Sequence, residues 1–170
     1  GGGRGPRAVD WRLGDAVAKP QVFKDTVAKR ASELAAGSHR GAGQGVALTP
    51  IERRIDGDTI SYKNVSIDIS RGRRNATFLV KAPQGDQPKD IAGIEAAGVN
   101  WWPLAMAREL DDAILHMRTN ELDIGTWILK TEGDSAAVLA ADATMEAHRE
   151  HWFVNETIGM LRRTFARLDV

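Results

Sequence analysis

The stretch from residue 100 to residue 134 constrains the fold of this chain more than any other part of the sequence. Its first half predicts a helix over residues 103–120, because proline suits the first helical turn and Asn120 can close the helix in a left-handed conformation. Apolar residues recur at spacings of three and four, which places them on one face; they are Leu104, Ala107, Leu110, Ile114 and Met117. The charged residues fall largely on the opposite face and include Glu109, Asp111, Asp112 and Arg118.

The second half of this stretch predicts a buried strand. Residues 122–129 are rich in Ile, Leu and Trp, and a mostly apolar run of this kind suits a strand covered on both faces. A helix followed by a strand and a polar loop is half of a βαβ unit, and such units carry ligand sites at the carboxyl ends of their strands. That end is residues 130–134, and the predicted fold class is α/β.

Length and composition limit the classes of protein to which the chain can belong. Its 170 residues suit one domain or two partial ones, and its 23 basic residues equal its 23 acidic residues in number. This neutral balance argues against a dedicated binder of nucleic acid or anionic membranes. There is no Cys, and no apolar run approaches the roughly 18 residues of a membrane span. We therefore expect a cytoplasmic protein.

The N-terminal 50 residues predict a helix and then a connector. Residues 20–36 carry an apolar stripe, formed by Phe23, Val27, Ala31 and Leu34, and Gly37 is suited to end the helix. The glycines of residues 38–49 indicate a flexible connector, where we place a domain boundary. The chain opens on three glycines without Met and stops just after a predicted helix. We therefore expect an excerpt of a longer polypeptide.

Residues 51–82 change to the two-residue period of strands. Ile60 and Tyr62 alternate, and a second alternating set begins at Val65, so a bulge near residues 63–64 would reconcile the two. Residues 71–74, Arg-Gly-Arg-Arg, form the turn to another strand over residues 76–80. This arginine cluster is interpreted as a solvated hairpin tip, with contact to a ligand phosphate as the alternative.

The last predicted helix runs from about residue 144 to residue 168. Its stripe repeats at four and three residues and comprises Val154, Ile158, Leu161, Phe165 and Leu168. Burial of such side chains is worth about 1.5–3 kcal/mol each, so we expect this helix to pack against the central strand.

Several polar groups invite a chemical interpretation. His148 and His151 are spaced as metal ligands on a helix can be, but they do not form H-E-x-x-H, and a solvated helix start is favoured. His116 is more simply a packed or surface residue than a base. Glu109, Asp111 and Asp112 could supply a general acid and base, but Asp111 and Asp112 point in different directions on a helix. A solvated face with Arg108 and Arg118 as partners is therefore favoured.

Five segments of the sequence resemble one known family. They are WWPLAMARELDDAILHMRTNEL, the following GTW and TEGD, the hairpin SIDISRGRRNATFLVKAP, and HWFVNETIGMLRRTFARLDV. Together they resemble the crotonase (enoyl-CoA hydratase/isomerase) superfamily, and within it the two-repeat lyases of CoA-bound benzoate degradation. The resemblance implies a crotonase-like fold with a partial ββα repeat. It places residues 1–37 at the C-terminal end of a first repeat, 38–50 in a Gly-rich linker, and 51–170 in the N-terminal half of a second, degenerate repeat.

The resemblance also implies an activity for the full-length parent. That parent would open the ring of 2,3-epoxybenzoyl-CoA with water and release formate in aerobic benzoate degradation. It would need no cofactor and no metal beyond the coenzyme A that the substrate carries, and it would form a homo-oligomer without nucleic-acid or membrane partners. Two alternatives stay open: a non-catalytic interaction or dimerisation module, and an enoyl-CoA hydratase or isomerase.

Residue by residue, the resemblance assigns no catalytic group to this chain. Crotonase sites stabilise a thioester enolate with two backbone N–H groups and use glutamates as acids and bases. The family's Gly-rich loop and catalytic glutamates match nothing in these 170 residues, and residues 137–142 lack the Gly of the segment F-S-A-G-x-D. The resemblance marks Thr131, Gly133, Ala140 and Ala141 as the positions nearest a substrate.

Overall fold

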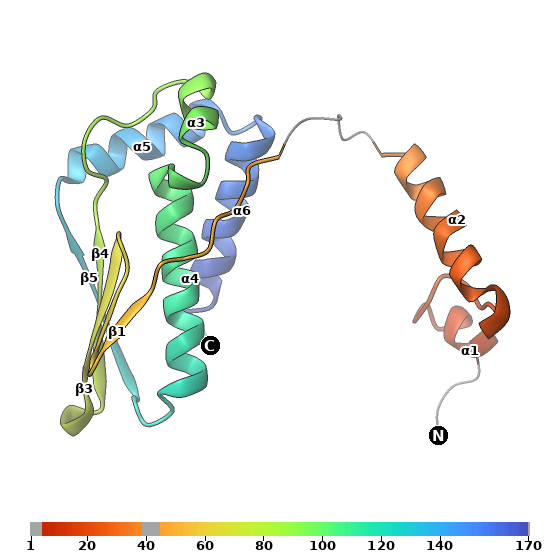
Figure 1. Ribbon diagram of the computed structural model, residues 1–170, viewed down its shortest axis with the longest axis horizontal. Coiled ribbons are helices and arrows are strands. Elements are labelled where there is room, and N and C mark those ends of the chain that lie inside the picture. Colours follow the sequence, from red (N-terminus) through yellow and green to blue (C-terminus); the bar gives the residue numbers. More distant parts are fainter. Residues whose placement is uncertain (1–4, 39–44, 170) are drawn as a thin grey trace. The chain divides into compact units, whose positions relative to one another are not determined.

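The computed structural model describes residues 5–38 and 45–169, and the chain divides into two compact units (Figure 1). The first unit is Gly1–Gln44 and the second is Gly45–Val170. Among the described residues, no helix combines the length and the apolar character needed to cross a membrane.

The first unit consists of short α1 (Gly5–Asp10), a 3-10 turn at Pro20–Val22 and α2 (Phe23–Ala36). The helix predicted over residues 20–36 is confirmed, with Pro20 at its start and Gly37 directly after it. None of the residues of α2 is buried, and the side chains of Phe23 and Leu34 are 59% and 60% exposed. The apolar stripe of α2 therefore has no covering partner within the described part of this unit.

The second unit is built on a five-stranded sheet. Its strands are β1 (Arg54–Asp56), β2 (Thr59–Ser61), β3 (Val65–Ser70), β4 (Asn75–Lys81) and β5 (Thr126–Glu132), in the spatial order β1-β2-β3-β4-β5. The first four strands pair antiparallel, whereas β4 and β5 are parallel. A parallel pair needs a long crossover, which here includes α4. The predicted α/β class is confirmed.

Four helices complete this unit: α3 (Ile91–Ala97), α4 (Trp102–Asn120), α5 (Ser135–Ala147) and α6 (Trp152–Ala166). Helix α4 confirms the helix predicted from the sequence. Its end differs in detail, since Asn120 is not left-handed and instead donates a hydrogen bond to the carbonyl oxygen of His116 at 3.0 Å.

The bulge predicted at residues 63–64 is wrong, because the chain reverses there. Residues 63 and 64 form a tight turn between β2 and β3, closed by the N–H of Tyr62 on the carbonyl oxygen of Val65 at 2.9 Å. Ile60 pairs with Ile67 across the two antiparallel strands. A hairpin turn shifts the alternation of apolar and polar residues just as a bulge does. The two-residue period of the sequence therefore does not distinguish a turn from a bulge.

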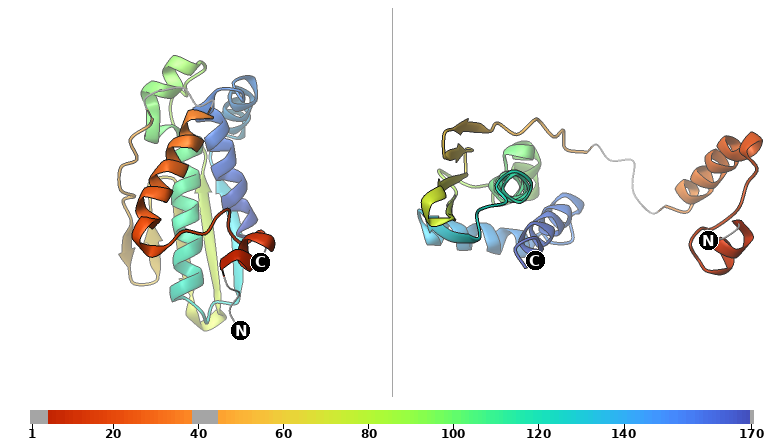
Figure 2. Two further views of the ribbon diagram at one scale, coloured as in Figure 1. Left: turned by 90° about the vertical axis from the view of Figure 1, so that its right-hand side faces the viewer. Right: turned by 90° about the horizontal axis from the view of Figure 1, so that it is seen from below.

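The core lies on one face of the sheet, where α4 covers the strands (Figure 2). Alternate residues of β2, β3 and β4 face it, and α4 contributes its apolar stripe. The residues of this core that are at most 1% exposed are Ile60, Val65, Ile67, Ala76, Phe78, Leu110, Ala113, Ile114 and Met117. The indole of Trp127 extends the same layer from β5, with its ring centroid 4.9 Å from that of Phe78.

Strand β5 forms where it was predicted, but the expectation that it is covered on both faces is wrong. Ile128 is 38% exposed and Leu129 is 50% exposed, and only Trp127 is partly buried. Among the described residues, β5 pairs with β4 alone, so it is an edge strand. Strand β5 therefore has more apolar side chains than its described neighbours bury.

The single helix predicted over residues 144–168 is instead two helices, broken at residues 148–151. Helix α6 packs against α4 with Phe153, Val154, Thr157 and Thr164 as its buried residues, whereas Phe165 is 48% exposed. The hydroxyl of Thr157 donates to the carbonyl oxygen of Phe153 at 2.9 Å, which satisfies it inside the contact. The buried residues of α6 thus include two threonines, whereas apolar periodicity had placed Phe165 in the contact.

Two arginines of the cluster at residues 71–74, Arg71 and Arg74, bind other parts of the protein. Arg71 donates from Nε to Asp58 at 2.7 Å and from its two terminal nitrogens to the carboxylate of Glu121 at 2.7 and 3.1 Å. Arg74 is left-handed and donates to the carbonyl oxygen of Asp123 at 2.9 Å. These contacts join the hairpin tip to the end of α4 and engage Arg71 and Arg74. Contact of the cluster, which includes the exposed Arg73, with a ligand phosphate stays a prediction.

We expect Arg71→Lys to raise the pKa of Glu121. The pKa of this carboxyl is lowered chiefly by its hydrogen bonds from Arg71, and lysine cannot reproduce the two-pronged contact. A lowered carboxyl pKa stabilises the fold above the unfolded pKa, and this contribution disappears as the pH falls through the folded pKa. NMR titration of Glu121 measures the change, with Arg73→Lys as the matched control. An unchanged pKa in Arg71→Lys would contradict the contact.

Candidate functional site

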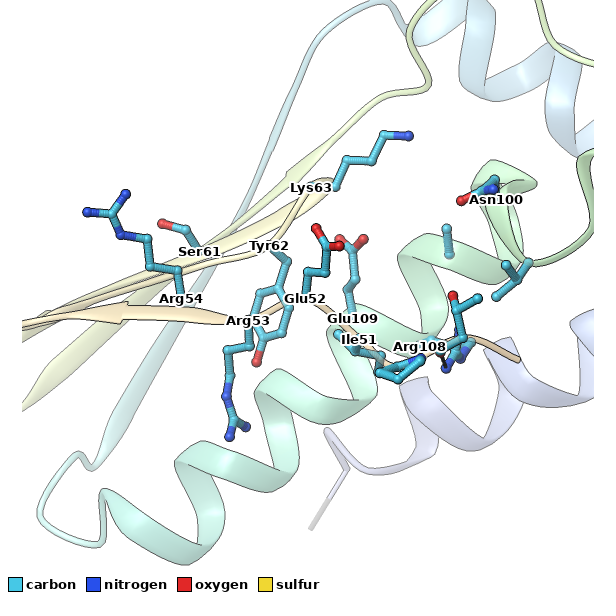
Figure 3. Close-up of a pocket in the computed structure, with 14 residues that line it drawn as sticks. Ile51, Glu52, Arg53, Arg54, Ser61, Tyr62, Lys63, Asn100, Arg108 and Glu109 are labelled. Carbon is cyan, nitrogen blue, oxygen red and sulfur yellow. Dashed lines mark hydrogen bonds between the residues drawn. The ribbon is translucent and has the colours of Figure 1, made fainter. Parts of the chain in front are cut away.

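A polar groove of about 790 Å³ runs between the chain before β1, the end of β2 and the first turns of α4 (Figure 3). Residues 49–54 form one wall, and α4 forms the other with Ala105, Arg108 and Glu109. Arg108 holds the first wall in place by donating to the carbonyl oxygen of Thr49 at 2.7 Å. Charged side chains of both signs line this groove, including Glu52, Arg53, Arg54 and Lys63.

A buried carboxylate lies at the centre of the groove wall. Glu109 is 9% exposed and accepts two hydrogen bonds from Asn64 in the turn between β2 and β3. The backbone N–H of Asn64 lies 2.6 Å from Oε2, and its side-chain Nδ2 lies 3.0 Å from Oε1. The carboxylate therefore joins α4 to the hairpin turn through both of its oxygens.

Burial raises the pKa of Glu109 above its ordinary value. The hydrogen bonds from Asn64 and from the backbone of Val65 oppose this shift, as does the positive charge of Lys63. These opposing contacts favour the charged form that burial disfavours. Glu109 is therefore a carboxyl whose proton affinity depends on the turn that contacts it.

A second polar cluster closes the neighbouring part of the groove. The hydroxyl of Tyr62 donates to Oδ2 of Asp112 at 2.8 Å, and Arg53 donates to the same oxygen at 3.0 Å. Burial, followed by the contact with Asp112, raises the pKa of Tyr62, so its phenol stays protonated and remains a donor. The carboxylate of Asp112 is thus engaged by two donors, which leaves it poorly placed to act as a base.

The carboxyl ends of β4 and β5 meet at a second hollow of about 120 Å³. Lys81 and Ala82 line it from β4 and the residue after it, and Glu132, Gly133 and Asp134 line it from β5 and the following loop. Gly133 has φ +113°, and a Cβ there would lie 2.7 Å from the Cβ of Ala82. Glycine is therefore required for the close approach of the two strand ends.

The structure separates the four positions marked as nearest a substrate. Thr131 lies near the end of β5, and Gly133 lies in the loop that follows and lines the second hollow. Ala140 and Ala141 lie inside α5, and Ala141 is buried. Amides inside a helix bond to carbonyl oxygens four residues earlier. The amides of these two alanines therefore point along α5 and not into a cavity.

The other polar candidates have structural partners. The ring of His148 lies 3.2 Å from the carbonyl oxygen of Lys89, and His151 lies 3.4 Å from Glu95. Within the described ranges, no group of three or more acidic, His or Cys side chains is placed to hold a metal ion. Asp111 is also engaged, since it accepts a hydrogen bond from Arg167 at 2.6 Å.

Glu109 was assigned to the solvated face of its helix, and that interpretation is wrong. The helical spacing contains a signal for its burial, because Glu109 stands three residues after Met106 and four before Ala113, both of which are buried. Its partner Asn64 could not be identified, because the contact depends on the turn between β2 and β3. Tyr62 was recognised only as a strand residue.

We expect Asn64→Ala to raise the pKa of Glu109 further and to destabilise the fold. The buried carboxylate would lose one of its two donors from this residue, at a cost of about 1–3 kcal/mol. A carboxyl pKa raised in the folded state makes the free energy of unfolding largest below the unfolded pKa, and smaller as the pH rises through the raised value. The Asn64→Ala substitution should therefore increase the loss of unfolding free energy as the pH rises.

NMR titration of Glu109 and urea unfolding at several pH values would measure both effects. Asn100→Ala is the matched control, since Asn100 also lines the groove but is exposed. A Glu109 pKa that is the same in Asn64→Ala as in the original chain would show that the turn does not determine it.

Comparison with known proteins identifies one informative relative. No family model matches the chain. The chain is 54% identical over 170 residues to benzoyl-CoA-dihydrodiol lyase from Aromatoleum evansii. This match covers 99% of the chain, whereas the chain spans 31% of the length of that lyase. Nearly the whole chain is therefore similar to a segment that makes up about a third of that lyase.

Proposed function

We propose that the chain is part of a crotonase-type CoA-thioester lyase. The full-length enzyme would open the ring of 2,3-epoxybenzoyl-CoA with water and release formate, in the aerobic degradation of benzoate. The observation that carries this proposal is the 54% identity, over 99% of the chain, to a protein named as a benzoyl-CoA-dihydrodiol lyase. Coenzyme A would be supplied by the substrate, with no further cofactor, and the cytoplasm is the expected location.

The same proposal gives the segments their places in the parent chain. Residues 1–37 would end a first crotonase-like repeat, residues 38–50 would link the repeats, and residues 51–170 would begin a second, degenerate repeat. The division of the chain into Gly1–Gln44 and Gly45–Val170 is compatible with a junction in this region. Homo-oligomerisation of the parent stays a prediction.

Within this enzyme, we assign the described residues a supporting role and not a catalytic one. Two carboxylates of this region are engaged, Glu109 by Asn64 and Asp112 by Tyr62 and Arg53. Ala140 and Ala141 lie inside α5, where their amides cannot form an oxyanion hole. The reacting groups would therefore come from the rest of the parent chain, and Thr131 and Gly133 would contact the thioester from the carboxyl end of β5.

The main alternative is a non-catalytic interaction or dimerisation module of a crotonase-family protein. The helical position of Ala140 and Ala141 favours it, because these two residues then do not supply the backbone donors that the chemistry requires. An enoyl-CoA hydratase or isomerase is the other alternative. No observation on the described residues favours that activity over the lyase.

We expect the full-length protein to release formate from 2,3-epoxybenzoyl-CoA. Thr131→Ala should raise KM several-fold and leave kcat nearly unchanged, because the contact would be lost equally from the bound substrate and from the transition state. Thr126→Ala is the matched control at the other end of the same exposed strand. Formate and CoA-thioester products can be followed by chromatography.

The alternatives predict different products. Hydration of an enoyl-CoA without formate would favour the hydratase and refute the lyase. An unchanged KM in Thr131→Ala, with formate still released, would refute the contact at β5 but not the lyase activity. A full-length protein inactive on both substrates would favour the interaction module.

A further inference from the structure

The backbone at the carboxyl end of β4 is bound by a side chain of α4. Lys81 ends β4, directly after the last pair that this strand forms with β3. Its N–H donates to the carbonyl oxygen of Asn64 at 2.8 Å, and its own carbonyl oxygen accepts from the indole Nε1 of Trp102 at 3.0 Å. Strand β3 begins at Val65, so it places no residue opposite this carbonyl. The indole of Trp102 therefore supplies the donor that the strand end would otherwise lack.

The same helix also holds the turn to which the N–H of Lys81 donates. Glu109 accepts from the backbone N–H of Asn64 at 2.6 Å and from its side chain at 3.0 Å. Trp102 and Glu109 lie about two helical turns apart on α4 and therefore on the same face. A closed set of contacts thus runs from α4 through Lys81 and Asn64 back to α4, and we refer to it as the α4 clamp.

On its other edge, the end of β4 meets the loop that follows β5. The N–H of Ala82 donates to the carbonyl oxygen of Glu132 at 2.8 Å. A Cβ at Gly133 would lie 2.7 Å from the Cβ of Ala82, so the strand end and this loop are in close contact. Lys81 and Ala82 also line a hollow of about 100 Å³ together with Trp102. Without the clamp, this hollow would give the strand end room to move.

The clamp ends at the hollow where the proposed lyase would hold its thioester. That hollow, of about 120 Å³, lies between the end of β4 and the loop containing Gly133. We propose that Trp102 and Glu109 are positioning residues, which fix the width of this hollow through the backbone at the end of β4. This role rests on the proposed function, in which Gly133 contacts the thioester. Neither side chain lines the hollow, so both act through the residues that do.

The small size of this hollow makes its width important for binding. It has room for few atoms, so a slight movement of Ala82 would change most of the contacts that a bound group makes. A site already held in its binding geometry loses less conformational freedom when the ligand binds. Loss of the clamp should therefore weaken thioester binding without removing any group that touches the thioester.

Calorimetric titration of the full-length protein with benzoyl-CoA tests this role, because benzoyl-CoA carries the thioester but no epoxide to open. Trp102→Phe keeps an aromatic ring and removes the indole donor, so it should raise the Kd roughly tenfold, as expected for the loss of one hydrogen bond. Trp127→Phe is the matched control, because Trp127 is another partly buried indole of the same core and pairs with Ala76 near the start of β4. Its Kd should stay within about twofold of the original value.

Two substitutions at Glu109 test the other end of the clamp. Glu109→Ala removes both acceptors of Asn64, whereas Glu109→Gln keeps a carbonyl oxygen for the backbone N–H. The first should raise the Kd about as much as Trp102→Phe, and the second clearly less. Equal Kd values in Trp102→Phe and the original protein would overturn the proposal. Equal weakening by Trp102→Phe and Trp127→Phe would also overturn it, because loss of core packing would then be the cause.

Hydrogen exchange of the Lys81 amide measures the clamp without any ligand. This amide should exchange roughly tenfold faster in Trp102→Phe than in Trp127→Phe, and equal rates would overturn the proposal. Failure of the lyase activity is a separate result. A protein that binds benzoyl-CoA but releases no formate from 2,3-epoxybenzoyl-CoA would refute the lyase, while the Kd values would still decide the role of the clamp. An original protein that does not bind benzoyl-CoA would overturn that role as well.

Discussion

The second unit depends on the burial of one face of its sheet beneath α4. Phe78 and Ile67 on the strands are fully buried in the same core as Ala113 and Ile114 on the helix. This single layer brings together hairpins before α4 in the sequence and a strand after it. Helix α6 then packs on α4, through small and internally bonded residues such as Thr157. Among the described residues, the other face of the sheet contributes none to this core, and Ile128 on that face is 38% exposed.

Two polar contacts position the hairpins on α4. Near its start, the carboxylate of Glu109 binds the turn at Asn64, and at its end Glu121 binds Arg71 of the next hairpin. The two contacts differ in their electrostatics, because burial raises the pKa of Glu109 while Arg71 lowers that of Glu121. Each of these two contacts fixes the position of a hairpin along α4. The apolar layer alone specifies that position less closely.

Local periodicity predicted the elements whose burial is complete within the chain. Helix α4 is the clearest case, because its stripe from Leu104 to Met117 is the one that the structure buries. Periodicity failed where a polar group is satisfied internally, as in Thr157 and Glu109, and where a turn and a bulge give the same alternation, as at residues 63–64. The position of strand β5 was predicted correctly. Its apolar composition also predicted burial on both faces, which its described neighbours do not provide. The groove could not be predicted, since it unites a turn, a helix and a connecting segment that are distant in sequence.

The most direct test of this account compares two neighbouring substitutions in α4. Ile114 is fully buried beneath the sheet, whereas Leu115 is 38% exposed. If the covered face holds the unit together, Ile114→Ala should lower the free energy of unfolding by about 2–5 kcal/mol, and Leu115→Ala by much less. Urea unfolding of the two variants would measure the difference. Equal losses from the two variants would contradict the account, because the layer between α4 and the sheet would then not be the source of stability.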